Sequence, residues 1–174
     1  MTLTLDTLER RKMRVAVDIR YMMYKDMLAV VEIEKTSFSG DTWDMEDFDY
    51  ALASANATGI VATIADKVVG FMVYKSTPKG YEIIDMAVHT SHMKNGIGTQ
   101  LIASLMRKLQ ACGRYFVLYS TLAQNAGSQA FMEKVGFTKQ GKPNKDQLVT
   151  YRYRLPPLRN EEQKQFLEHV GAMC

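Results

Sequence analysis

The chain is predicted to fold as one α/β domain, with a mixed, mostly antiparallel, twisted sheet flanked by helices. Two observations lead to this prediction. Short runs rich in β-branched residues alternate with stretches in which apolar residues recur every three or four positions, so strands and helices are interleaved along the chain. The length of 174 residues is also enough for one compact core but not for two full domains.

The predicted elements follow the order strand, helix, helix, three strands, helix, strand, helix and two strands. The third helix is the clearest, because apolar residues from Ile97 to Leu109 share one face before Gly113 ends it. Asp44 is the expected N-cap of the second helix, and a turn at Asp66 and Lys67 is expected to close a hairpin. The full set is strands at 17–22, 60–64, 68–74, 82–88, 115–119, 137–140 and 148–155, with helices at 25–34, 45–54, 97–113 and 126–135.

The domain is expected to span residues 17–155. Residues 1–16 would form an N-terminal extension, and residues 156–174 a C-terminal helical tail. No internal repeat, low-complexity tract or linker divides the chain, so every candidate site should lie within this one domain.

Composition and charge exclude several classes of protein. Apolar residues make up 47% of the chain and charged residues 24%, which is ordinary globular usage and excludes a disordered chain. The net charge is only +3, so we expect no nucleic-acid partner. No long apolar run or leader-like segment is present, and we therefore expect no membrane span and a cytoplasmic location. From Cys112 and Cys174 alone, no disulfide framework or metal-ligand spacing can be predicted, and no metal is expected.

The most informative segment joins the strand that ends at Val88 to the helix that begins near Ile97. Gly96 and Gly98 leave the backbone open at the start of this helix, where unpaired amides and the helix dipole favour an anion such as phosphate. Lys94 adds a positive charge. A dinucleotide-binding motif would need a further glycine at position 101, which is leucine, and a P-loop would need Gly-Lys-Ser/Thr. The segment therefore matches neither of these nucleotide-binding motifs.

The segment IIDMAVHTSHMKNGIGTQLI resembles the acetyl-CoA-binding segment of the GNAT acetyltransferase superfamily, whose pattern is Gln/Arg-x-x-Gly-x-Gly/Ala. The run NAGSQAFMEKVGF resembles the family's Asn-containing helix, and MMYKDMLAVVEIEKTSFSGDTWDMEDF resembles the substrate-side helices of the branch that acetylates the N-terminal alanine of a ribosomal protein. The resemblance covers residues 17–155 and implies the single-domain GNAT fold with acetyl-CoA as cosubstrate.

The resemblance also implies which residues hold the cosubstrate. Loop amides would bind the pyrophosphate, and Asn125 would bind the pantetheine arm, although an asparagine at a helix start is also an ordinary N-cap. The implied set is Met86, Ala87, Val88, Met93, Lys94, Asn95, Gly96, Ile97, Gly98, Thr99, Asn125, Ser128 and Phe131. The chain departs from the pattern at Met93, which stands at the Gln/Arg position, and at Met132, which replaces a tyrosine that protonates the departing thiolate. Tyr119 or Tyr151 could take the place of this tyrosine as the acid, and Tyr119 is the one that we assign as catalytic.

The chemistry of amine acylation requires a base, because only the neutral amine attacks a thioester carbonyl. Glu82 is the first candidate, six residues before Val88, with an exposed strand-edge glutamate as the plain alternative. Asp85 is the second, although simple strand alternation would turn it to the opposite face from Glu82.

We therefore expect an acetyl-CoA-dependent N-acetyltransferase that works by direct attack in a ternary complex, since no activated Cys or Ser-His pair can be assembled. The acceptor would be a protein N-terminus or a small-molecule amine, and the protein a monomer or homodimer. The alternative is a catalytically weak sensor that binds acyl-CoA, which the departures at Met93 and Met132 would favour.

Overall fold

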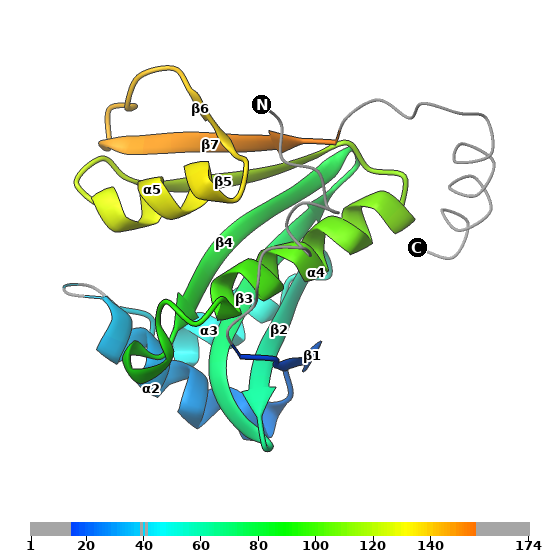
Figure 1. Ribbon diagram of the computed structural model, residues 1–174, viewed down its shortest axis with the longest axis vertical. Helices are drawn as coiled ribbons and strands as arrows, with labels where there is room; N and C mark the ends of the chain where they lie inside the picture. Colours follow the sequence, from blue (N-terminus) through cyan, green and yellow to red (C-terminus); the bar gives the residue numbers. More distant parts are fainter. Residues whose placement is uncertain (1–14, 39, 41, 156–174) are drawn as a thin grey trace.

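The computed structural model describes residues 15–38, 40 and 42–155 (Figure 1). The expected C-terminal tail, 156–174, and nearly all of the N-terminal extension lie outside these described residues. Within them, no helix is both long and apolar enough to cross a membrane.

The described residues form one α/β domain around a seven-stranded sheet, as the sequence predicts. Its spatial order is β1-β2-β3-β4-β5-β7-β6, and every neighbouring pair is antiparallel except the parallel pair β4 and β5. The strands are β1 (Asp18–Tyr21), β2 (Ala57–Ile64), β3 (Lys67–Thr77), β4 (Gly80–Val88), β5 (Phe116–Leu122), β6 (Thr138–Gln140) and β7 (Leu148–Arg154). The helices are α2 (Met27–Ser37), α3 (Met45–Leu52), α4 (Ile97–Ala111) and α5 (Ala126–Lys134), with short 3-10 turns η1 (Tyr24–Asp26) and η2 (Thr90–His92).

Helices cover both faces of the sheet, and each face has its own core. On the first face, α4 and α5 pack over side chains such as Met72, Ile83 and Val117, and Figure 1 shows α4 lying across β3 and β4. On the second face, α2 and α3 pack over Val61, Phe71 and Val73. We call these the α4 face and the α2 face, because the chemistry below depends on which of them a side chain joins.

Two local predictions can be compared directly with the structure. Asp44 is the N-cap of α3, accepting from the amides of Glu46 and Asp47, and the Asp44 amide donates to the Asp47 side chain, which completes a capping box. The hairpin between β2 and β3 turns at Ala65 and Asp66, which both have positive φ, one residue earlier than predicted. Two consecutive left-handed residues are typical of a tight hairpin turn that matches the twist of its strands.

The sheet splits in its middle, between the parallel strands β4 and β5. The two strands pair only from Gly80 with Phe116 to Ile83 with Tyr119, and beyond this point they diverge (Figure 1). Strand β5 remains paired to β7 up to Leu122, while β4 continues beside β3 up to Val88. Among the described strands, none pairs with the second half of β4 on this side, so its backbone edge is open in the interior of the sheet.

Candidate active site

A β-bulge in β4 lies at the point where the strands part. Val73 pairs with Asp85 and Tyr74 pairs with Ile83, so Ile84 is an extra residue without a partner on β3. Ile83 packs in the α4-face core, whereas both Ile84 and Asp85 turn to the α2 face, where Val73 also lies. The alternation of side chains is thereby shifted by one residue.

The bulge overturns the expectation that Asp85 and Glu82 face opposite sides of the sheet. Glu82 pairs with Lys75, which is two residues from Val73 and therefore on the same face of β3. Since Val73 is also the partner of Asp85, both carboxylates of β4 lie on the α2 face. Simple alternation fails here because it assumes an uninterrupted strand, and the extra residue restores Asp85 to the face of Glu82.

Asp85 lies beside a second carboxylic acid, Glu34 of α2. Glu34 is only 4% exposed, and its Oε1 accepts a hydrogen bond from the amide of Trp43 at 3.3 Å. Its Oε2 and the Oδ2 of Asp85 are both buried, and no described residue donates a hydrogen bond to either atom. Two facing carboxyl groups without other donors can satisfy each other only by sharing a proton.

This environment changes the proton affinity of both acids. Burial, and secondly the negative charge of Glu34, raise the pKa of Asp85 to about 7, although the nearby Met86 amide lowers it. Burial also raises the pKa of Glu34, against the opposing effect of the Trp43 amide. A carboxylate with a pKa near neutrality can both take up and release a proton at physiological pH, which is what a general base requires.

Glu82, the first candidate base from the sequence, occupies a different position. It lies in the part of β4 that is paired on both sides, opposite Lys75 of β3 and Leu118 of β5. Asp85 follows the last residue pair and lies at the split itself. The geometry therefore favours Asp85 over Glu82 as the group nearest the open edge.

The loop before α4 has a backbone geometry compatible with the anion site expected there. Lys94 and Gly96 have φ of 62° and 82°, in the left-handed region, and Gly96 is the N-cap of α4 without a side-chain cap. From residue 94 to 99, no backbone amide donates a hydrogen bond to another described residue; the first to do so is that of Gln100, to the Gly96 carbonyl. Consecutive unpaired amides at a helix N-terminus fit the oxygens of a phosphate or pyrophosphate.

Gly98 has a packing role that the sequence alone did not indicate. A Cβ on this residue would lie 3.1 Å from the ring of Phe131, so α5 approaches the start of α4 at this point. Ile97 anchors the same turn in the core at 1% exposure, whereas the side chain of Met93 is 44% exposed. The absence of a side chain at Gly98 therefore allows the two helices to meet beside the loop.

Tyr119 of β5 and Ser128 of α5 form a pair of hydroxyls at the split, with the oxygens 2.8 Å apart. The side-chain oxygen of Asn125 accepts from the Ser128 amide at 3.0 Å and so caps α5, which is the ordinary N-cap role of an asparagine at a helix start. Tyr119 joins the α4-face core, so the two residues predicted as catalytic, Glu82 and Tyr119, lie on opposite faces of the sheet.

Met132 and Tyr151 are poor candidates for the acid that protonates the leaving thiolate, the first because it is buried and the second because its hydroxyl is hydrogen-bonded elsewhere. Met132, at the position of the family's tyrosine, is fully buried in the core. The hydroxyl of Tyr151 is within 3.2 Å of Gln129 and 3.1 Å of Glu133, and burial and the Glu133 carboxylate raise its pKa. Tyr119, which belongs to the last residue pair between β4 and β5, is left as the candidate acid.

Glu34 was missed by sequence reasoning, although a signal for it exists. In α2 the buried residues Met27, Val30 and Glu34 follow helical spacing, so an acid stands where the pattern requires an apolar side chain. A carboxylate at a core position needs a partner or a function. What the sequence could not indicate is that the partner would be Asp85.

The split sheet, the loop of residues 94–99 with its unpaired amides (the anion loop) and the buried acid pair have the geometry of an α/β protein suited to a phosphate-bearing ligand and to proton transfer beside it. Residues 27–137 match the acetyltransferase (GNAT) family, and the chain belongs to that family. It is therefore an acetyl-CoA-dependent acetyltransferase. No curated protein matches the chain significantly in sequence.

Solved structures share the fold at low sequence identity. The ribosomal-protein-S18-alanine N-acetyltransferase of Escherichia coli is 20% identical, with a TM-score of 0.69, over 84% of this chain and 97% of that one. The PaiA N-acetyltransferase of Thermoplasma acidophilum, in complex with coenzyme A, is 14% identical, with a TM-score of 0.71, over 80% and 99%. A putative streptothricin acetyltransferase of Bacillus anthracis, in complex with acetyl coenzyme A, is 18% identical, with a TM-score of 0.63, over 80% and 99%.

Proposed function

We propose that this protein transfers the acetyl group of acetyl-CoA to an amine by direct attack in a ternary complex, with Asp85 as the general base. The observation that carries this proposal is the buried Glu34–Asp85 pair at the strand split, where burial, and secondly the charge of Glu34, raise the pKa of Asp85 to about 7. Acetyl-CoA supplies an acetyl group already activated as a thioester. The residues of this chain have to bind acetyl-CoA, deprotonate the amine and protonate the leaving thiolate.

The fit of the cosubstrate rests on two features of the backbone. The unpaired amides from Lys94 to Thr99 match the oxygens of a pyrophosphate, and the open edge of β4 offers peptide groups to the amide-containing pantetheine arm. The amides of Met86 and Val88 are the proposed partners of that arm. Ala87 contributes differently, because its side chain is buried in the α2-face core and fixes this part of the strand.

Asp85 would act from the α2 face and Tyr119 from the α4 face. An aliphatic amine is an ammonium ion at neutral pH, and the ionised Asp85 both attracts it and removes its proton. On the other side, the Tyr119 hydroxyl, held by Ser128, can donate to the thiolate. A thiol has a pKa of about 8.5, so the leaving group requires only a weak acid.

The acceptor that we propose is an amine that is cationic at neutral pH, either a protein N-terminus or a small-molecule amine. The acidic pair on the α2 face supports this class of substrate, because Glu34 and Asp85 together carry at least one negative charge above the pKa of Asp85. The resemblance to the S18 alanine acetyltransferase branch motivates a peptide that begins with alanine as the first acceptor to test.

Two variants of β4 test the assignment of the base. Asp85→Asn should lower kcat by roughly 10²- to 10⁴-fold with acetyl-CoA affinity unchanged, and Glu82→Gln, the matched change on the same face, should lower it far less. The acceptors would be a peptide with N-terminal alanine, a polyamine and free lysine, with products identified by mass spectrometry. If Glu82→Gln loses activity and Asp85→Asn does not, the base is Glu82, as first considered from the sequence.

The same assay separates an enzyme from a sensor. The buried Met132, in place of the family's tyrosine, is the observation that favours a catalytically weak protein. A sensor would bind acetyl-CoA tightly yet release no free thiol with any acceptor in the panel. Release of thiol above the solvent rate, lost in Asp85→Asn, would contradict the sensor.

A further inference from the structure

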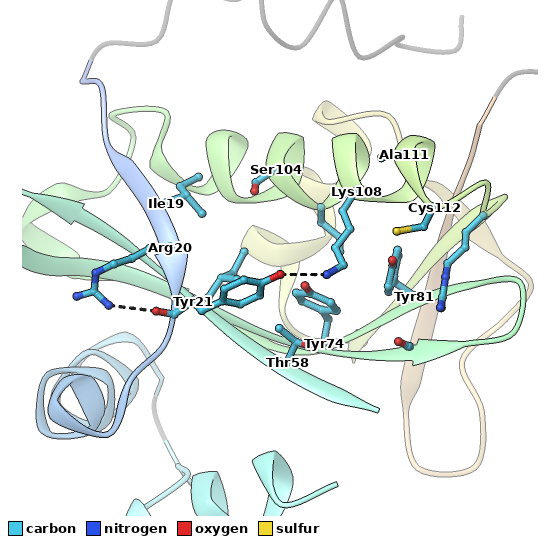
Figure 2. Close-up of a pocket in the computed structure, with 14 residues that line it drawn as sticks. Ile19, Arg20, Tyr21, Thr58, Tyr74, Tyr81, Ser104, Lys108, Ala111 and Cys112 are labelled. Atoms are coloured by element: carbon cyan, nitrogen blue, oxygen red, sulfur yellow. Dashed lines mark hydrogen bonds between the residues drawn. The ribbon is translucent and has the colours of Figure 1, made fainter. Parts of the chain in front are cut away.

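A cavity lies on the α4 face, away from the strand split. It measures about 640 Å³ and lies between the second half of α4 and the strands β1 to β4 (Figure 2). Lys108 lines it, whereas the anion loop lies at the first turn of α4, about three helical turns away, or roughly 16 Å at 1.5 Å per residue. The cavity is also on the opposite face from Asp85, so it is not part of the acetyl-transfer site.

Two positive groups in this cavity lack a negative partner among the described residues. The Lys108 ammonium extends toward the Tyr21 ring, 3.4 Å from its hydroxyl oxygen, and meets no carboxylate there (Figure 2). The Arg114 guanidinium stacks 4.7 Å from the centre of the Tyr81 ring and donates only to the neutral carbonyls of Thr77 and Gly80.

A third cation in the lining, Arg20, differs from these two because it has a carboxylate partner. Arg20 binds the Asp26 carboxylate through two bonds of 2.6 and 2.9 Å and is therefore neutralised. Among the described residues, no aspartate or glutamate lines the cavity. The space between Lys108 and Arg114 thus carries two positive charges that an incoming anion could balance.

The walls of the cavity are aromatic with hydroxyl groups at their edges. The rings of Tyr74 and Tyr81 meet edge to face at 5.4 Å, and both residues are almost fully buried. Burial raises the pKa of both phenols, so they stay neutral donors at physiological pH. Ser104 of α4 adds a hydroxyl to the lining. A flat apolar body can pack against such rings while its polar end reaches the cations.

We propose that this cavity is a second ligand site, which binds a small organic anion with an aromatic body, its carboxylate or phosphate held by Lys108 and Arg114. The volume is that of an ordinary small-molecule site, for which about 300 to 1,000 Å³ is usual. The site is independent of the proposed acetyl transfer, because it shares no residue with the anion loop or the strand split.

The test is calorimetric titration of the full chain with benzoate, indole-3-acetate and phenyl phosphate. Their neutral counterparts, benzamide, indole-3-acetamide and phenol, are titrated in parallel. Coenzyme A is present at saturation throughout, so that the anion loop is occupied and cannot bind the probes. At least one anion should bind saturably, and about tenfold or more tightly than its neutral counterpart. The carboxylate and phosphate arms identify which anionic group the site takes.

Variants locate the binding. Lys108→Met keeps the length of the side chain and removes its charge, and it should weaken the anion about tenfold or more. Lys139→Met, on the exposed edge strand β6, is the matched control and should have no effect. Ser104→Leu keeps both charges but fills the cavity, and it should also weaken binding. Acetyl-CoA affinity should be the same in all three variants.

Three results would overturn the proposal. The first is that no anion binds saturably with coenzyme A present, which would mean that the cations are simply solvated. The second is that the neutral probes bind as tightly as the anions. The third is that Lys108→Met binds the anion as well as the unaltered protein does. None of these results bears on acetyl transfer, which is measured separately by thiol release.

Discussion

Replacing Asp85 by asparagine should remove activity and at the same time stabilise the fold at alkaline pH. The pKa of Asp85 is raised from 3.8 to about 7 in the folded protein, so the fold prefers the protonated acid. In the unfolded chain the carboxyl ionises freely above its ordinary pKa. The folded state therefore loses stability as the pH rises from about 4 through about 7.

The magnitude follows from the size of the shift. About three pKa units, at about 1.4 kcal/mol each, give at most about 4 kcal/mol of lost stability at pH 8. Asparagine is neutral at every pH and avoids this loss. Because its amide can also donate to the Oε2 of Glu34, which has no donor among the described residues, the variant should keep the site packed.

The assay is urea unfolding of both proteins at pH 5 and pH 8. The unfolding free energy of Asp85→Asn should exceed that of the unaltered protein by a few kcal/mol at pH 8 and by clearly less at pH 5. Asp18→Asn, at an exposed position on β1, is the control and should give the same small difference at both pH values. An Asp85→Asn variant that is less stable than the unaltered protein at pH 8 would refute the buried, raised-pKa carboxyl.

The remaining predictions concern the acid pair, the loop and a helix cap. Burial is the larger cause of the raised pKa of Asp85, and the negative charge of Glu34 is the second. Glu34→Gln removes only this second cause, so the acidic limb of the kcat/KM profile should move part of the way to lower pH with coenzyme A affinity unchanged; a limb that does not move would contradict the coupling. Gly96→Ala forces a Cβ into a left-handed residue and should weaken coenzyme A binding about tenfold, whereas Gly141→Ala, with a φ of 67° and no neighbour within 4 Å, should strain the backbone similarly but leave affinity unchanged in calorimetry. Asp44→Ala should cost about 1 kcal/mol in urea unfolding, and an unchanged midpoint would mean that the capping box contributes nothing.

The sequence determined those features of the protein that depend on neighbouring residues. The order of strands and helices follows from short-range periodicity, and the cap at Asp44 and the glycine loop before α4 follow from local hydrogen-bonding needs. The amides that the loop leaves unpaired are those of consecutive residues, so a candidate anion site could be predicted from the chain alone.

The tertiary structure decided where the catalytic chemistry could lie. Asp85 turns to the face of Glu82 because β4 has one more residue than β3 across the bulge, and such a mismatch exists only once two strands are paired. Glu34 meets Asp85 because α2 packs on that face of the sheet, an encounter between residues distant in sequence. Periodicity describes each element by itself, whereas a buried pair of acids arises only where two elements exclude water together.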